Sequence, residues 1–255
     1  MSLPFLISIP HGGTVVPAEL RKRVRLSDDE ILADGDPFTD IIYDVKDEVA
    51  VQLTFEIARA IIDVNRAPDD LPPANPDGVL KTLSIFGNRI YHPGMEPHDQ
   101  EISRLLAEYH QPYHDAIGAA LSASDVVLAL DCHSMEAVGP PIAADAGERR
   151  PLFCLGNNGG MACSMETTRL FAHCLAEVFA VSLDAVTINR PFAGGYITRR
   201  YGGVPVPWIQ VEMSRGLYLG ERNLRVPETA DANPEKLREL NGCFRRAIRL
   251  LAGRL

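Results

Sequence analysis

The sequence has few cysteines and no long apolar run, and both absences limit what the protein can be. Its five cysteines are odd in number and form no Cys-x-x-Cys pair, so neither a secreted disulfide framework nor a zinc ribbon is expected. No apolar stretch approaches the ~18 residues that a membrane-spanning helix needs. The N-terminus lacks the charged start of a signal peptide and turns early, at His11-Gly12-Gly13. We therefore expect a cytoplasmic protein without a membrane partner.

Positive charge is also scarce. The chain carries 25 Lys and Arg against 34 Asp and Glu, a net charge of −9. A sequence-independent nucleic-acid binder needs a basic surface to displace counterions, so no nucleic-acid partner is expected. An acidic small-molecule ligand would have to be held by a few placed arginines.

The rest of the composition is that of a globular protein. Of 255 residues, 46% are hydrophobic and 23% are charged, which excludes a disordered or fibrous chain. Two segments rich in proline or glycine, 66–78 and 137–151, predict long loops. Neither separates regions of different composition, so we expect a single α/β domain over residues 1–255.

Three segments show the apolar spacing of amphipathic helices. They are 102–117, 170–178 and 237–251. Pro112 lies inside the first and should kink or split it, because proline removes a backbone donor.

Four short apolar runs between these helices predict buried strands. The runs are 6–10, 61–65, 126–131 and 209–212. Continuous apolar strands that alternate with helices favour a mostly parallel sheet. We therefore predict an α/β fold with a mostly parallel, mixed sheet and helices on both faces.

Polar residues end each of these four runs. They are His11, the Asp63–Arg66 segment, the Asp131–Ser134 segment and Glu212. In open α/β sheets, ligands bind outside the carboxyl ends of the strands. The convergence of histidines, a glutamate and an arginine there is the strongest indication of a site.

His11 and His133 form the natural metal pair, although two separate histidines are often structural. A catalytic zinc takes three protein ligands and keeps one position open. The third ligand is predicted in the acidic segment Asp34-Gly35-Asp36. Strand alternation would place Asp131 near the metal, on the face of His133.

Glu212 closes an apolar strand, where a carboxylate must be paired or functional. It could act as a general base beside a metal-bound water. The alternative is a buried ion pair with Arg199, Arg200 or Arg215. Arg66 could stabilise a developing oxyanion, or it could be an ordinary surface arginine.

Three further features carry residue types that could serve a site. The segment 194–203 could bind a carboxylate through an arginine, or it could be a surface hairpin. His110 and His114 are predicted to be solvated, because the zinc-helix motif that they resemble lacks its glutamate and contains a proline; the alternative is that His114 reaches the site. Cys132 is disfavoured as the nucleophile of a cysteine amidase, since it should point away from His133.

Taken in order, several segments resemble the N-formylglutamate amidohydrolase family. The resemblance runs from the N-terminus to about residue 220. It rests on Ile7-Ser8-Ile9-Pro10-His11-Gly12-Gly13, Asp36 through Tyr43-Asp44, Asp63-Val64-Asn65-Arg66, Pro112-Tyr113-His114, Asp131-Cys132-His133-Ser134, Gly194-Gly195-Tyr196-Ile197-Thr198-Arg199 and Gln210-Val211-Glu212. One segment departs from it: Asn189-Arg190-Pro191-Phe192 stands where the family has Asn-Gly-Arg-Phe, so the resemblance implies the chemistry more firmly than the substrate.

The family is similar in fold to zinc carboxypeptidases and aspartoacylases, and this likeness implies a role for each residue. One zinc ion would be held by three ligands: His11, Asp36 and His133. Arg66 would polarise the scissile carbonyl, and Glu212 would be the base. Asn65, from the Asn-Arg pair, and Arg199 would bind the substrate.

The resemblance implies zinc-dependent hydrolysis of a small N-acyl amino acid. The first candidate is N-formyl-L-glutamate, cleaved to formate and L-glutamate as in histidine degradation. One alternative is a related metallo-amidohydrolase that acts on another N-acyl amino acid or on a peptidoglycan amide. Another is a non-catalytic small-molecule binding protein of the same fold.

Overall fold

A central sheet organises the computed structural model, which describes residues 2–123, 125–219 and 232–255. Within these residues the sheet has six strands in the order β2-β1-β3-β6-β4-β5. The strands are β1 (Leu3–Ile9), β2 (Val49–Thr54), β3 (Leu128–Met135), β4 (Phe153–Gly156), β5 (Val186–Ile188) and β6 (Trp208–Ser214).

Strand direction confirms the mostly parallel, mixed sheet. β2, β1, β3 and β6 run parallel to one another. β4 is antiparallel to β6, and β5 is parallel to β4. The carboxyl ends of β1, β3 and β6 therefore meet at one edge of the sheet.

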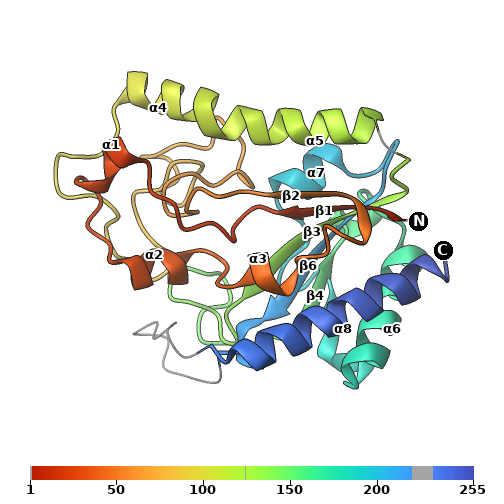
Figure 1. The fold of residues 1–255 in the computed structure, drawn as a ribbon. Coiled ribbons are helices and arrows are strands. Elements are labelled where there is room, and N and C mark those ends of the chain that lie inside the picture. Colours follow the sequence, from red (N-terminus) through yellow and green to blue (C-terminus); the bar gives the residue numbers. More distant parts are fainter. Residues whose placement is uncertain (1, 124, 220–231) are drawn as a thin grey trace.

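Helices cover both faces of the sheet, as predicted (Figure 1). On one face lie α4 (Asp99–Leu105), α5 (Gln111–Ala123) and α7 (Tyr196–Tyr201); on the other lie α3 (Thr39–Ile42), α6 (Met165–Phe179) and α8 (Pro234–Ala252). The short helices α1 (Ala18–Arg21) and α2 (Asp28–Asp34) precede α3, and single 3₁₀ turns occur at Asn158–Gly160, Leu183–Ala185 and Arg215–Leu217. No helix in the described part of the chain is long and apolar enough to cross a membrane.

Each face has its own apolar core, and β3 contributes to both. Leu130 and Cys132 pack in the cluster beneath α6 and α8. Ala129 packs in the cluster beneath α5. Asp131 and His133 share this second face, because successive strand residues alternate. The predicted separation of Cys132 from His133 is thus confirmed.

The predicted strand at 61–65 is wrong. Ile61, Ile62 and Val64 are fully buried among the residues of α5, but their segment is a series of turns. The amides of Ile61 and Ile62 both donate to Ala58 O, at 2.9 and 3.1 Å. A short apolar run indicates burial without specifying the backbone. The strand at the edge of the sheet beside β1 is instead β2, and its burial is mixed, as is usual for an edge strand.

Pro112 does split the first predicted helix. A π-helical turn, Leu106–His110, separates α4 from α5 and ends two residues before the proline. The amide of Gln111 bonds back to Leu106 O, five residues earlier. The wider turn accommodates Pro112, which has no backbone N–H to donate to the helix. The other two helical predictions are confirmed in α6 and α8.

Candidate active site

A cavity of about 960 Å³ opens at the carboxyl ends of β1, β3 and β6. His11 follows β1, and His133 and Glu212 lie in the last halves of β3 and β6. All three line the cavity, as do parts of the loops 66–78 and 137–151. Both loops consist mainly of turns, as their proline and glycine content predicts. The chain thus gathers its strand-end polar groups in one place.

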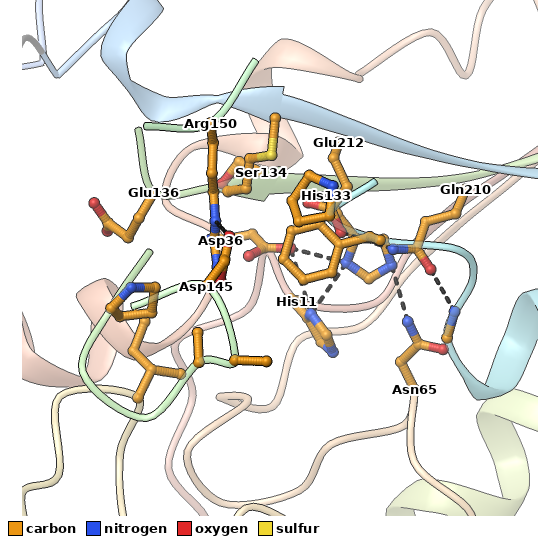
Figure 2. A pocket seen from close by; sticks show the side chains of 18 of the residues that line it. His11, Asp36, Asn65, His133, Ser134, Glu136, Asp145, Arg150, Gln210 and Glu212 are labelled. Atoms are coloured by element: carbon orange, nitrogen blue, oxygen red, sulfur yellow. Dashed lines mark hydrogen bonds and ion pairs between the residues drawn. The ribbon is translucent and has the colours of Figure 1, made fainter. Parts of the chain in front are cut away.

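His11, Asp36 and His133 converge at the base of this cavity (Figure 2). His133 Nδ1 lies 2.9 Å from Asp36 Oδ2 and 3.1 Å from His11 Nδ1. His11 Nδ1 lies 3.3 Å from Asp36 Oδ2. All three residues are buried, and their donor atoms lie within 4.8 Å of one another.

Backbone contacts bring Asp36 to the histidines. The amide of Asp36 donates to His11 O at 2.9 Å, which fixes the end of α2 against the end of β1. Gly35 makes this approach possible, because a Cβ there would lie 2.9 Å from His11 O. Arg215 holds the other carboxylate oxygen of Asp36, with Nη2 3.0 Å from Oδ1.

Each histidine is also held from behind. His11 Nε2 lies 2.8 Å from Asp63 Oδ1. His133 Nε2 lies 3.3 Å from Asp131 Oδ2 and 3.0 Å from Asn65 Nδ2. A carboxylate on the far nitrogen is the usual support of a metal-binding histidine, because it fixes the ring and raises its basicity. Both rings therefore present Nδ1 to Asp36.

The donor set fits a divalent cation. Zinc ligands lie ~2.0–2.1 Å from the ion, so neighbouring donors of a tetrahedral site lie roughly 3.3–3.4 Å apart. The three observed separations, 2.9, 3.1 and 3.3 Å, require little adjustment. Two histidines and a carboxylate suit zinc, and other divalent ions accept the same ligands.

The electrostatics of the cluster also favour a cation. Burial alone would raise the pKa of Asp36, but hydrogen bonds from His11 and His133 hold it well below its usual range. Burial would lower the pKa of His133, yet the nearby charge of Asp131 and the bond to Asp36 keep it well above normal. The surrounding carboxylates thus stabilise positive charge at this point.

The structure separates the two candidates for the third ligand. Asp34 is buried but accepts a 2.7 Å hydrogen bond from the amide of Ile85. Its other carboxylate oxygen lies 3.6 Å from Arg59 Nη1. Asp36, and not Asp34, belongs to the cluster with the two histidines.

Glu212 lies directly opposite His133 in the pairing of β6 with β3. Its side chain accepts a 2.7 Å hydrogen bond from Gln210 Nε2. Burial raises the pKa of the Glu212 carboxyl to about 7, which suits a group that exchanges protons near neutral pH.

The alternative ion pair for Glu212 does not form within the described residues. Arg215 bonds instead to Asp36 and to Glu136. Arg199 bonds to Gly194 O, and Arg200 bonds to the Tyr196 hydroxyl.

Comparison with known proteins identifies the family. A family model described as N-formylglutamate amidohydrolase matches residues 3–219. The chain belongs to this family. It is 33% identical over 234 residues to an N-formylglutamate deformylase of Pseudomonas aeruginosa, covering 86% of this chain and 84% of the relative. An N-formylglutamate deformylase of Pseudomonas putida is 28% identical over 228 residues, covering 86% and 83%.

Solved structures agree on the fold of the family. An N-formylglutamate amidohydrolase from Ralstonia eutropha JMP134 superposes with a TM-score of 0.80 at 22% identity, covering all of this chain and 96% of that one. A gene product of Agrobacterium tumefaciens gives a TM-score of 0.69 at 16% identity, covering 99% and 90%.

Arg66 and Arg199 line the cavity but differ in their partners. Arg66 Nη2 donates to Asp77 Oδ2 at 2.7 Å, within its own loop. Arg199 Nη1 donates to Gly194 O at 2.7 Å, which leaves most of its guanidinium donors uncommitted. The arginine of the Asn-Arg pair is therefore neutralised by its own loop, whereas the arginine of α7 is not.

Asn65 connects the histidine cluster to α7. Its side-chain oxygen accepts from the amide of Ile197 at 2.8 Å, while its nitrogen faces His133. Gly195 is required at this junction, because a Cβ there would lie 2.3 Å from the Asn65 side chain. Both polar atoms of the Asn65 side chain thus contact other residues of the protein.

The prediction that His110 and His114 are solvated is wrong. Both are buried, at 3% and 5% exposure. His114 Nε2 donates to Val64 O at 2.9 Å, and His110 Nε2 donates to Arg66 O at 3.0 Å. They fix the turn that carries Asn65. The missing glutamate argued against a zinc helix, but it did not indicate solvent exposure.

Sequence reasoning overlooked the supporting role of Asp63 and Arg59. Arg59 Nε lies 3.1 Å from Asp63 Oδ2, so one carboxylate serves both this arginine and His11. The sequence contains one indication of this role: Asp63 is a carboxylate in a buried apolar run, where it requires a partner.

Proposed function

We propose that this protein is a metal-dependent amidohydrolase that cleaves N-formyl-L-glutamate to formate and L-glutamate. The observation that carries the proposal is the convergence of three metal-donor atoms beside a buried glutamate, in a cavity lined with arginines. Two curated relatives that align with 86% of this chain are named N-formylglutamate deformylases, which supports the same substrate.

His11, Asp36 and His133 would hold one divalent ion, with zinc preferred for this ligand set. When bound, the ion would polarise the formyl carbonyl and acidify the attacking water. Asp63 and Asp131 would keep both imidazole rings in the binding orientation.

Glu212 would be the general base. It would take the proton of the attacking water and then deliver it to the departing amine of glutamate. Gln210 would orient it through the hydrogen bond to Oε1. Burial supports this role, because it brings the pKa of the Glu212 carboxyl to about 7.

Arginines would complete the site. Arg66 would stabilise the oxygen that becomes negative during attack, for which it must share its guanidinium with Asp77. Arg199 would bind a substrate carboxylate. Asn65 would position α7 and contact the substrate at the edge where it faces His133.

The test is formate release from N-formyl-L-glutamate by zinc-loaded protein, with and without a chelator. We expect release that the chelator abolishes. Glu212→Gln should lower kcat by ~10²–10⁴-fold, the usual contribution of a general base, while zinc content stays that of the wild type. Near wild-type turnover in this variant would contradict the role of Glu212. No release from zinc-loaded wild-type protein would contradict the substrate.

A further inference from the structure

Four arginines that line the cavity are neutralised by carboxylates of the chain itself. Their shortest contacts with a carboxylate oxygen range from 2.6 to 3.1 Å. The pairs are Arg59 with Asp63, Arg66 with Asp77, Arg150 with Asp145, and Arg215 with Glu136. These arginines hold the walls of the cavity together and offer little free charge to a ligand.

Arg190 and Arg199 differ from these four. Neither forms an ion pair with a carboxylate of the described residues, although both line the cavity. Arg199 has a single backbone acceptor, Gly194 O, and the Arg190 guanidinium has no hydrogen-bond partner within the described parts of the chain. Two cations that face one cavity without protein anions are suited to a ligand with two negative groups.

The backbone that carries Arg190 is fixed, although its guanidinium has no partner among the residues that the structure describes. The amide of Asn189 donates to Leu155 O at 2.8 Å. The Asn189 side chain accepts from the amide of Asn157 at 2.9 Å and donates to Asn157 Oδ1 at 2.8 Å. The carbonyl of Arg190 accepts from the Thr187 hydroxyl. The anchored backbone fixes where the Arg190 side chain begins, so binding a ligand requires ordering of the side chain alone.

The two arginines stand at different points relative to Glu212. The Arg199 guanidinium bonds to Gly194 O, and the next residue, Gly195, donates to Gln210 Oε1. Gln210 in turn bonds to Glu212. Arg199 is thus joined to the proposed base by a short chain of contacts. Arg190 follows Asn189, which is anchored to Asn157 beyond the end of β4. Among the described residues, the Arg190 guanidinium has no comparable chain of hydrogen bonds to Glu212.

We propose that Arg190 binds the side-chain carboxylate of the substrate, while Arg199 binds the α-carboxylate next to the scissile amide. Arg190 would then select acidic N-formyl amino acids over neutral ones. This inference rests on the proposed function. Its physical reason is that a carboxylate accepts two charge-assisted hydrogen bonds from a guanidinium, whereas a neutral amide of the same shape brings no charge.

The test compares two substrates of nearly equal shape, N-formyl-L-glutamate and N-formyl-L-glutamine. Their kcat/KM values are measured for the zinc-loaded wild type and for Arg190→Gln, Arg190→Lys and Arg200→Gln. The matched control is Arg200, an exposed arginine of α7 that contacts Tyr196 and does not line the cavity. Arg190→Gln should lower kcat/KM for the glutamate substrate by ~10–100-fold, the loss of one good charged contact, mainly through KM. The glutamine substrate should change less than about twofold, by the same reasoning.

Arg190→Lys should retain part of the preference, since it keeps the charge but loses the planar fork. Arg200→Gln should behave as the wild type with both substrates. Equal losses with both substrates in Arg190→Gln would overturn the proposal, because Arg190 would then bind a group that the two share. An unchanged preference would overturn it as well.

If the proposed function is wrong, the outcome can be distinguished from a failure of the role proposed for Arg190. If the zinc-loaded wild type hydrolyses neither compound, calorimetric binding of the same two compounds replaces kcat/KM. Tighter binding of N-formyl-L-glutamate that disappears in Arg190→Gln would support the role of Arg190 without the reaction. Equal binding of both compounds by the wild type, or no binding of either, would overturn it.

Discussion

At the scale of single residues, the site depends on how each histidine is held. His11 and His133 both present Nδ1 to Asp36, while a carboxylate takes Nε2. Asp63 has two partners, because it contacts His11 and also forms an ion pair with Arg59. A metal site is sensitive to such partners, since they set the ring orientation and the basicity of the ligand.

Asp63→Asn is therefore expected to weaken zinc binding by ~10–100-fold, the usual effect of removing a partner behind a metal ligand. The amide loses the charge of the carboxylate, which weakens the support of His11. It keeps the carboxylate's shape, so the fold should persist. Competition with a fluorescent chelator measures the affinity. Asp145→Asn is the matched control, because Asp145 lines the same cavity but pairs with Arg150. Zinc affinity equal to the wild type in Asp63→Asn would show that His11 needs no such support.

At the scale of elements, α8 is attached to the sheet by charge as well as by apolar packing. Leu237, Phe244 and Leu251 are buried in the core beneath it. Glu48, just before β2, accepts from Arg249 Nε at 2.7 Å and also from Arg245. One carboxylate thus joins two successive turns of the C-terminal helix to the start of an edge strand.

This contact predicts a pH-dependent stability. The hydrogen bond from Arg249 lowers the pKa of the Glu48 carboxyl, so ionised Glu48 stabilises the folded state. Its contribution is complete above the ordinary pKa of a glutamate, ~4.3, and is lost as the pH falls through the lower pKa of the folded state. Glu48→Gln should cost about 1 kcal/mol of unfolding free energy at pH 7, as for other partly exposed charged contacts.

Urea unfolding of wild type and Glu48→Gln at several pH values measures this difference. The two curves should converge as the pH falls through the lowered pKa of the folded-state Glu48 carboxyl, because the wild-type carboxyl is then neutral as well. Glu235→Gln is a control at the start of the same helix. A difference between wild type and Glu48→Gln that stays constant with pH would contradict the assignment.

At the scale of the whole molecule, the proposed metal joins distant parts of the chain. Its three ligands follow β1, follow α2 and lie within β3. An ion that binds only the folded state stabilises it by mass action, by about 2.7 kcal/mol at a concentration of 100 times Kd. In a chain of this size each kcal/mol raises Tm by ~2–4 °C.

Saturating zinc should therefore raise Tm by ~5–10 °C over the chelated protein. Differential scanning calorimetry measures the shift, and His133→Asn should abolish it. A Tm that zinc and chelator leave unchanged would contradict a metal centre at this position. The single domain expected over residues 1–255 stays a prediction.

The fold class and most of the residues that meet in the cavity could be predicted from the amino-acid sequence. The amphipathic periods of α6 and α8 follow from the spacing of their own apolar residues, which is a local property. The sequence also predicts that His11, His133 and Glu212 lie at strand ends and close together, since parallel strands bring their carboxyl ends to the same side of the sheet.

The remaining features depend on contacts that form when the chain folds. The choice of Asp36 over Asp34 depends on which carboxylate the loop after α2 turns toward His11. The burial of His110 and His114, and the turn at 61–65, depend on the packing of α5 against that segment. The lack of a carboxylate partner for Arg190 among the described residues could be recognised only after four other cavity arginines had been paired with their carboxylates. Each of these depends on contacts between residues far apart in the sequence, and hydrophobic pattern encodes burial without encoding which partners meet.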